Sequence, residues 1–245
     1  MGTELNNAVF VTPSTKIRFK CTGCGECCRH VKESVPVSCQ DAFYMAKYLR
    51  DTGSDIYCID QFLSEYATPA LLDDCGFFVY FLNTVGEDDA CIFLKDNRCT
   101  VQKAKPTACR LYPFMVDPTG AGGFRFLYSR EREHHFRGPL VETKNWMKKN
   151  FPQENRAFTQ EEYAKAGSIG QYLRMIPENR KTEALMHFLR LRYSEYDLDF
   201  PFLEQFRRNQ EKLLASLFRM AQDEMSTRPK HRSRYNEYGK YRKRS

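Results

Sequence analysis

Cysteine is the residue type that most constrains the fold of this chain of 245 residues. All ten cysteines lie between residues 21 and 109, and residues 110–245 contain none. Within that segment about one residue in nine is cysteine, a density typical of small domains built around disulfides or metals. The cysteines are Cys21, Cys24, Cys27, Cys28, Cys39, Cys58, Cys75, Cys91, Cys99 and Cys109.

The rest of the sequence favours metal over disulfides. Residues 1–20 carry Glu4, Asn6 and Asn7 where a secretory signal needs an apolar stretch, so we expect a cytoplasmic protein. The reducing cytosol keeps thiols free to bind metal, and adjacent cysteines cannot bridge each other without strain. The longest apolar run, residues 77–82, is too short to span a bilayer, so we expect no membrane association.

The spacing Cys21-x2-Cys24-x2-Cys27 places three thiols in one short loop, with Gly23 and Gly25 between them. Glycine permits the turns and the close backbone approach that a shared centre requires. Such a run is similar to the iron–sulfur loops of ferredoxins, whereas structural zinc more often takes separated Cys-x2-Cys pairs. The spacing therefore favours an iron–sulfur cluster such as 4Fe-4S, with zinc as the alternative and a set of redox or structural thiols as a third interpretation.

Three segments carry a resemblance to a known family. Residues 21–29 read Cys-Thr-Gly-Cys-Gly-Glu-Cys-Cys-Arg, residues 91–94 read Cys-Ile-Phe-Leu, and residues 99–114 contain Lys-Pro-Thr-Ala-Cys-Arg-Leu-Tyr-Pro. Over about residues 17–140 the chain resembles the YkgJ-type cysteine cluster family (CxxCxxCC), described as a zinc- or iron-chelating domain. The motifs supply a pool of metal ligands: Cys21, Cys24, Cys27, Cys28, Cys91, Cys99 and Cys109.

The chain departs from the family pattern at several positions. Gln102 stands where tyrosine is usual, and Lys105 replaces the arginine before Pro106. The downstream Cys-Pro-Gly of many members is absent, and residues 134–138 read His-His-Phe-Arg-Gly instead. Their place in the motif order makes both of these histidines, His134 and His135, candidate ligands.

Seven motif cysteines exceed the four that one cubane or one zinc ion needs. Either a second metal centre is present or some of these cysteines are spare. His30 follows the first motif closely, but we expect it to be exposed or to support a ligand. We expect Cys39, Cys58 and Cys75 to be small core residues, because they lie outside the motifs.

Helix and strand signals predict an α+β protein: a small irregular cysteine-cluster unit with short helices and β-hairpins, followed by a helical C-terminal part. Ser38-x2-Asp41 predicts a capping box and a helix that ends at residues 51–53. A second helix is predicted over residues 59–66. Further helices are predicted over residues 161–175, 178–193 and 202–225, the last with an apolar stripe, and strands over residues 77–82, 90–94, 99–102 and 124–129. The turn at residues 95–98 should bring Cys99 back towards Cys91.

The same signals predict three parts: a metal-binding domain over residues 1–140, a helical region over residues 141–225 packed on it, and a basic disordered tail over residues 226–245. The chain has a formal net charge of +7. The tail holds the entire excess, since residues 1–225 are balanced. We expect a solubilising tail. The alternative is contact with RNA or another polyanion, with Tyr235, Tyr238 and Tyr241 stacking on bases.

The leading interpretation is a cytoplasmic metal-cluster protein that binds an iron–sulfur cluster in a structural, redox or catalytic role. A zinc-binding module whose tail contacts RNA or another polyanion is one alternative. A second follows from the resemblance, because the motif also occurs in a flagellin lysine methylase: a cluster-dependent protein-modifying enzyme such as a lysine N-methylase. The sequence contains no nucleophile elbow, zincin helix or paired-carboxylate motif, so acid–base catalysis by the protein alone lacks support.

Overall fold

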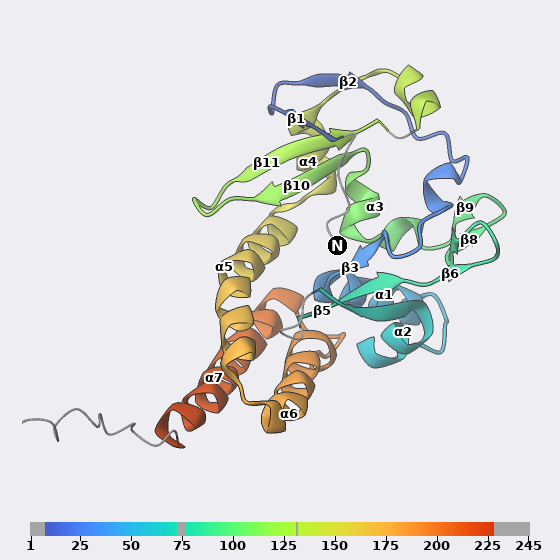
Figure 1. Ribbon diagram of the computed structural model, residues 1–245. Helices are drawn as coiled ribbons and strands as arrows, with labels where there is room; N and C mark the ends of the chain where they lie inside the picture. Colours follow the sequence, from blue (N-terminus) through green and yellow to red (C-terminus); the bar gives the residue numbers. More distant parts are fainter. Residues whose placement is uncertain (1–7, 73–76, 131, 228–245) are drawn as a thin grey trace, which may run out of the picture.

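The computed structural model describes residues 8–72, 77–130 and 132–227, an α+β chain in which small antiparallel sheets are combined with helices (Figure 1). This confirms the predicted fold class. The helices are α1 (Cys39–Asp51), α2 (Ile59–Tyr66), α3 (Thr107–Leu111), α4 (Thr143–Asn150), α5 (Gln153–Met175), α6 (Glu178–Leu189) and α7 (Phe202–Thr227). Among the described residues, no helix has both the length and the apolar character that crossing a bilayer would need.

Every strand pairing in the described residues is antiparallel. One sheet has the order β1 (Ala8–Val11), β11 (Phe124–Ser129), β10 (Phe114–Pro118), and a second has the order β3 (Pro36–Val37), β5 (Phe78–Leu82), β4 (Ala67–Leu71). The two-stranded pairs are β2 (Lys16–Arg18) with β12 (Leu140–Glu142), β6 (Thr84–Val85) with β7 (Ala90–Cys91), and β8 (Leu94–Lys95) with β9 (Arg98–Cys99).

The predicted capping box begins α1 as expected. Ser38 Oγ accepts from the Asp41 backbone N–H at 3.1 Å, and the Asp41 carboxylate accepts from the Ser38 N–H at 3.3 Å. The other Asp41 oxygen accepts from both the backbone N–H and the hydroxyl of Thr107, each at 2.8 Å. One carboxylate therefore holds the start of α1 and the start of α3 together.

Several predicted boundaries differ from the structure. The strand predicted over residues 90–94 is wrong at its centre, because residues 92–93 form a turn between β7 and β8. The strand predicted over residues 99–102 is wrong beyond Cys99, because Gln102–Ala104 forms a 3-10 turn. Helix α5 begins at Gln153, well before residue 161, because Pro152 adopts a φ of −65° and forms its N-cap. Helix α6 ends at Leu189, and Arg190–Ser194 continues it as a π-helical turn.

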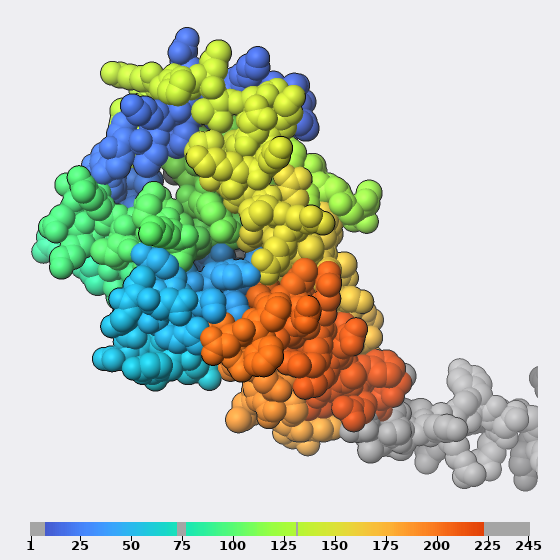
Figure 2. All heavy atoms as spheres, turned by 180° about the vertical axis from the view of Figure 1, so that it is seen from behind, coloured from blue at the N-terminus to red at the C-terminus, as the bar shows by residue number. Residues whose placement is uncertain are grey.

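Two hydrophobic clusters form the core. The larger joins α1 and α2 to the C-terminal helices α5, α6 and α7, which lie beside them in both views (Figures 1 and 2). Five residues of the predicted α7 stripe are buried in it: Phe202, Phe206, Leu213, Leu217 and Met220. Phe218 is 44% exposed, and its ring forms a T-shaped pair with that of Tyr172, with centroids 5.5 Å apart. The smaller cluster contains Ile17, Phe19, Leu111, Phe114, Met147 and Phe151.

Cys75 and residues 228–245 of the basic tail lie outside the described residues. The expectations for that cysteine and for polyanion binding by the tail therefore stay predictions. The division of the chain at residue 140 also stays a prediction.

Candidate metal centre

The first cysteine motif forms an irregular loop that ends in the 3-10 turn Glu26–Cys28. Gly25 adopts a φ of +77°, and a side chain there would lie 3.1 Å from Leu94 Cδ1 and 3.2 Å from the carbonyl oxygen of Asn97. The glycine thus lets the loop pack directly against the β8–β9 hairpin. This is the close backbone approach that the sequence predicted.

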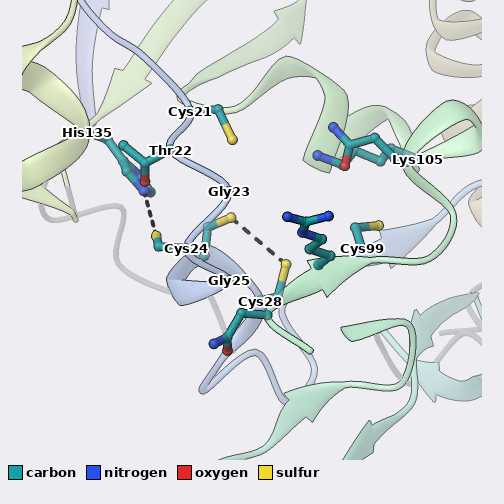
Figure 3. A pocket seen from close by; sticks show the side chains of 13 residues that line it. Cys21, Thr22, Gly23, Cys24, Gly25, Cys28, Cys99, Lys105 and His135 are labelled. Carbon is teal, nitrogen blue, oxygen red and sulfur yellow. Dashed lines mark hydrogen bonds between the residues drawn. The ribbon is translucent and has the colours of Figure 1, made fainter. Parts of the chain in front are cut away.

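The seven motif thiols line two adjoining cavities. The first, the loop cavity, is lined by Cys21, Cys24, Cys27, Cys28 and Cys99 among others (Figure 3). Its volume is about 410 Å³. The second, the thiol cavity, has a volume of about 400 Å³ and is lined by Cys27, Cys28, Cys91, Cys99 and Cys109 among others. Cys27, Cys28 and Cys99 are common to both linings. The structure therefore gathers all seven predicted ligands in one region.

Separate elements bring the later thiols to this region. Cys91 ends β7, where it pairs with Thr84, and Cys99 ends β9, where it pairs with Leu94. The turn between β8 and β9 is formed by Asp96 and Asn97, both with positive φ. Cys99 is returned to the cavity that Cys91 lines, as the turn signal predicted. Cys109 lies on α3, whose first residue is held by the Asp41 carboxylate.

The thiols of the thiol cavity perturb one another. Cys27 and Cys28 Sγ lie 3.9 Å apart, and the hydrogen bond between them lowers the pKa of Cys27 to about 6 and raises that of Cys28. Burial, followed by the charges of Cys91 and Cys27, raises the pKa of Cys109 to about 12. Burial also raises the pKa values of Cys91 and Cys99. These buried thiols need a cation to become thiolates together.

Cys24 meets two histidines from a distant segment. The Nε2 atoms of His134 and His135 each lie 3.3 Å from Cys24 Sγ, and both histidines come from the 3-10 segment Glu133–Arg137. Burial raises the pKa of Cys24, but hydrogen bonds from Thr22, His134, the Glu26 backbone and His135 outweigh it and lower the pKa to about 6. The three ligand atoms lie within 4.8 Å of one another.

Tyr112 is a neighbour of this trio that the sequence analysis did not single out. Its hydroxyl lies 3.2 Å from His135 Nδ1, on the side of the ring away from Cys24. Tyr112 belongs to the third motif segment, so the motif could have drawn attention to this residue. Only the fold shows that the Tyr112 hydroxyl reaches His135. Such a contact fixes the tautomer and orientation of a ligating imidazole.

Gly138 sets how closely the histidine segment approaches the first motif. A side chain at Gly138 would lie 2.5 Å from Lys20 Cβ and 2.7 Å from the Phe19 carbonyl carbon. Two backbone hydrogen bonds join the segments here, from Lys20 N–H to the His135 carbonyl and from Phe19 N–H to the Pro139 carbonyl, each at 3.0 Å. The missing side chain therefore permits the contact between Cys24 and the histidines.

His30, Cys39 and Cys58 lie outside the group formed by Cys24, His134 and His135. His30 lines the thiol cavity but is exposed and has a φ of +55°. Cys39 is fully buried in the larger core cluster, where burial raises the pKa of its thiol. Cys58 is partly exposed at the N-terminus of α2, so the expectation that it is a core residue is wrong, and it lines neither cavity.

A comparison with protein families gives one match. The model of the CxxCxxCC family, described as a proposed zinc- or iron-chelating domain, matches residues 20–150. No curated protein and no solved structure matches the chain. The family match confirms the resemblance seen in the sequence, and together with the Cys24, His134 and His135 cluster it supports metal binding.

Proposed function

Because the chain belongs to the CxxCxxCC family, we propose that it is a metal-cluster protein whose thiol cavity holds an iron–sulfur cluster. The ligands are drawn from the five cysteines that line this cavity: Cys27, Cys28, Cys91, Cys99 and Cys109. Cys21, which lines only the loop cavity and is exposed, stays a ligand candidate.

The spacing of the thiols carries this proposal. In a tetrahedral zinc site with Zn–S bonds of about 2.3 Å, neighbouring sulfurs lie about 3.8 Å apart. Within the described part of the chain, no three cysteine sulfurs approach one another to within 4.8 Å. A cluster of iron and sulfide is several ångströms across and is held by sulfurs that are further apart. Five thiols around a shared cavity therefore suit a cluster better than a single ion.

The chemistry of the donor set also fits such a group. Cysteine sulfurs are the soft ligands that iron–sulfur clusters require. Without a cation, the Cys109 thiol is held in the protonated form, because burial raises its pKa to about 12. Lys105 lines both cavities, and its charge lowers the pKa of Cys27, so it favours thiolates at this end.

A cluster in this position would join four separate segments of the chain. The first motif loop, β7, β9 and α3 each contribute at least one thiol to the cavity. When bound, the cluster supplies one-electron chemistry, and the chain's own residues hold its sulfur ligands and limit the access of water. The joining of segments also gives the metal a structural role, because binding free energy becomes folding free energy.

The test is metal and sulfide analysis of the full chain purified without oxygen, with an absorption spectrum. We expect a brown protein that contains iron and acid-labile sulfide. Cys109→Ser should lose both, and the matched control Cys58→Ser should keep both, since Cys58 lines neither cavity. A colourless wild-type protein that contains only zinc would overturn the proposal.

A further inference from the structure

We propose that Cys24, His134 and His135 form a second metal site, separate from the thiol cavity, that takes a single zinc(II) ion and leaves one coordination position open to the loop cavity. This inference rests on the proposed function in one respect: the iron–sulfur cluster is assigned to the thiol cavity, so Cys24 is not needed as a cluster ligand. Cys24 and His135 line the loop cavity, and none of the three residues lines the thiol cavity.

The geometry of the three ligand atoms carries this inference. With Zn–S near 2.3 Å and Zn–N near 2.05 Å, tetrahedral zinc places a sulfur and a nitrogen ligand about 3.5 Å apart. Both histidine Nε2 atoms lie 3.3 Å from Cys24 Sγ, and all three atoms are within 4.8 Å of one another. Within the described ranges, no other Cys, His, Asp or Glu side chains form such a group.

The histidines are held in place by other contacts. The His135 side chain is only 2% exposed, and its two ring nitrogens face different partners: Nε2 faces Cys24 and Nδ1 faces the Tyr112 hydroxyl. Phe19 meets the same ring edge-on, with centroids 6.1 Å apart. The His134 ring lies against that of His135, with centroids 4.2 Å apart. Such support is typical of metal ligands, whose second nitrogen is nearly always bonded.

The surroundings of the trio define the fourth position. Three protein ligands leave tetrahedral zinc one place for water or an exchangeable ligand, as in catalytic zinc sites. Arg98 and Lys105 lie in the lining of the loop cavity, and no Asp or Glu does. A small anion is therefore the class of ligand that this position would take.

The test uses the full chain, purified without oxygen and supplied with zinc(II), with zinc X-ray absorption to identify the ligand atoms. We expect one zinc per chain, bound to one sulfur and three nitrogen or oxygen atoms. His134→Ala should weaken zinc binding at least about 100-fold and leave the iron content unchanged. The matched control is His187→Ala, because His187 lies on α6 and lines neither cavity; it should change neither metal.

Each remaining outcome decides between the two proposals. Zinc surrounded by four sulfurs, or zinc and iron lost together in His134→Ala, would overturn the second site. Zinc with one sulfur in a protein that never contains iron would support this site and overturn the cluster. In the cobalt(II) form, azide should change the visible bands of the wild-type protein; unchanged bands would overturn the open position.

Discussion

Replacement of Asp41 by alanine should weaken the fold at both helices that its carboxylate caps. The side chain is 6% exposed and accepts four hydrogen bonds, from the N–H and hydroxyl groups of Ser38 and Thr107. Loss of the α1 cap costs about 1 kcal/mol. Loss of a charged acceptor for the Thr107 donors costs about 2–4 kcal/mol more, so we expect a total of about 3–5 kcal/mol.

Urea unfolding of the metal-loaded chain measures this loss. Trp146 is the sole tryptophan, and its Nε1–H donates to the Leu111 carbonyl at the end of α3, so its fluorescence reports on that helix. With an m-value of about 3 kcal/mol/M, the midpoint should fall by about 1–1.7 M. Asp41→Asn, which keeps one acceptor oxygen, should lose about half as much.

Asp51 provides the matched control, because it lies at the other end of the same helix and its side chain is 54% exposed. Asp51→Asn should leave the midpoint unchanged within error. The reasoning fails if Asp41→Ala is no less stable than Asp51→Asn. Cys109 follows Thr107 on α3, so the alanine variant should also retain less iron than the control.

Four further predictions concern the metal sites. Gly138→Ala should destabilise the chain by about 1–3 kcal/mol and weaken zinc binding, because the new Cβ would lie 2.5 Å from Lys20 Cβ. Ordinary contact begins at 3.4 Å, so the two segments must separate by about 0.9 Å. Gly120→Ala, with nothing within 4 Å of the new Cβ, is the control, and equal zinc affinity in both variants would contradict the argument. In the metal-free chain, iodoacetamide should modify Cys24 at pH 7 and spare Cys109, because their pKa values are about 6 and about 12. Because the pKa of Cys24 is lowered from 9.0 to about 6 in the folded state, its ionisation stabilises the folded metal-free chain fully above pH 9. This stabilisation should be lost as the pH falls from 9 to about 6. A urea midpoint that rises as the pH falls over that range would refute the assignment. Chelation should expose residues 21–109 to limited proteolysis while α7, whose stripe is buried without metal, is spared; identical digestion with and without metal would show that the metal does not support the fold.

Local patterns in the sequence predicted local structure well. The pair Ser38 and Asp41 predicted the start of α1, and the aromatic-rich segment after the glycine-rich turn correctly predicted β11 over residues 124–129. These signals depend on neighbours in the chain, which the sequence displays directly. The strand predicted beyond Cys99 was wrong, because the chain changes direction there before α3 and Gln102–Ala104 forms a 3-10 turn.

The site was only partly visible in the sequence for the same reason. The motifs identified every thiol that lines the two cavities, and the motif order drew attention to His134 and His135. That both imidazoles meet Cys24 in particular, 110 and 111 positions earlier in the chain, depends on the backbone contacts around Gly138. Contacts over such separations arise from packing of whole segments, and no periodicity in a single sequence encodes them.

The long separation between Cys24 and its histidines has a consequence for the order of events during protein synthesis. The last motif thiol, Cys109, leaves the ribosome before His134 and His135. At about 5–20 residues per second, all seven thiols are available on the order of 1–5 s before the imidazoles arrive. During that interval Cys24 competes with its neighbours for whatever metal is present. If both proposed sites bind metal, the division of thiols between them should depend on arrival time as well as on affinity, and metal supply during translation should help to determine which centre is filled first.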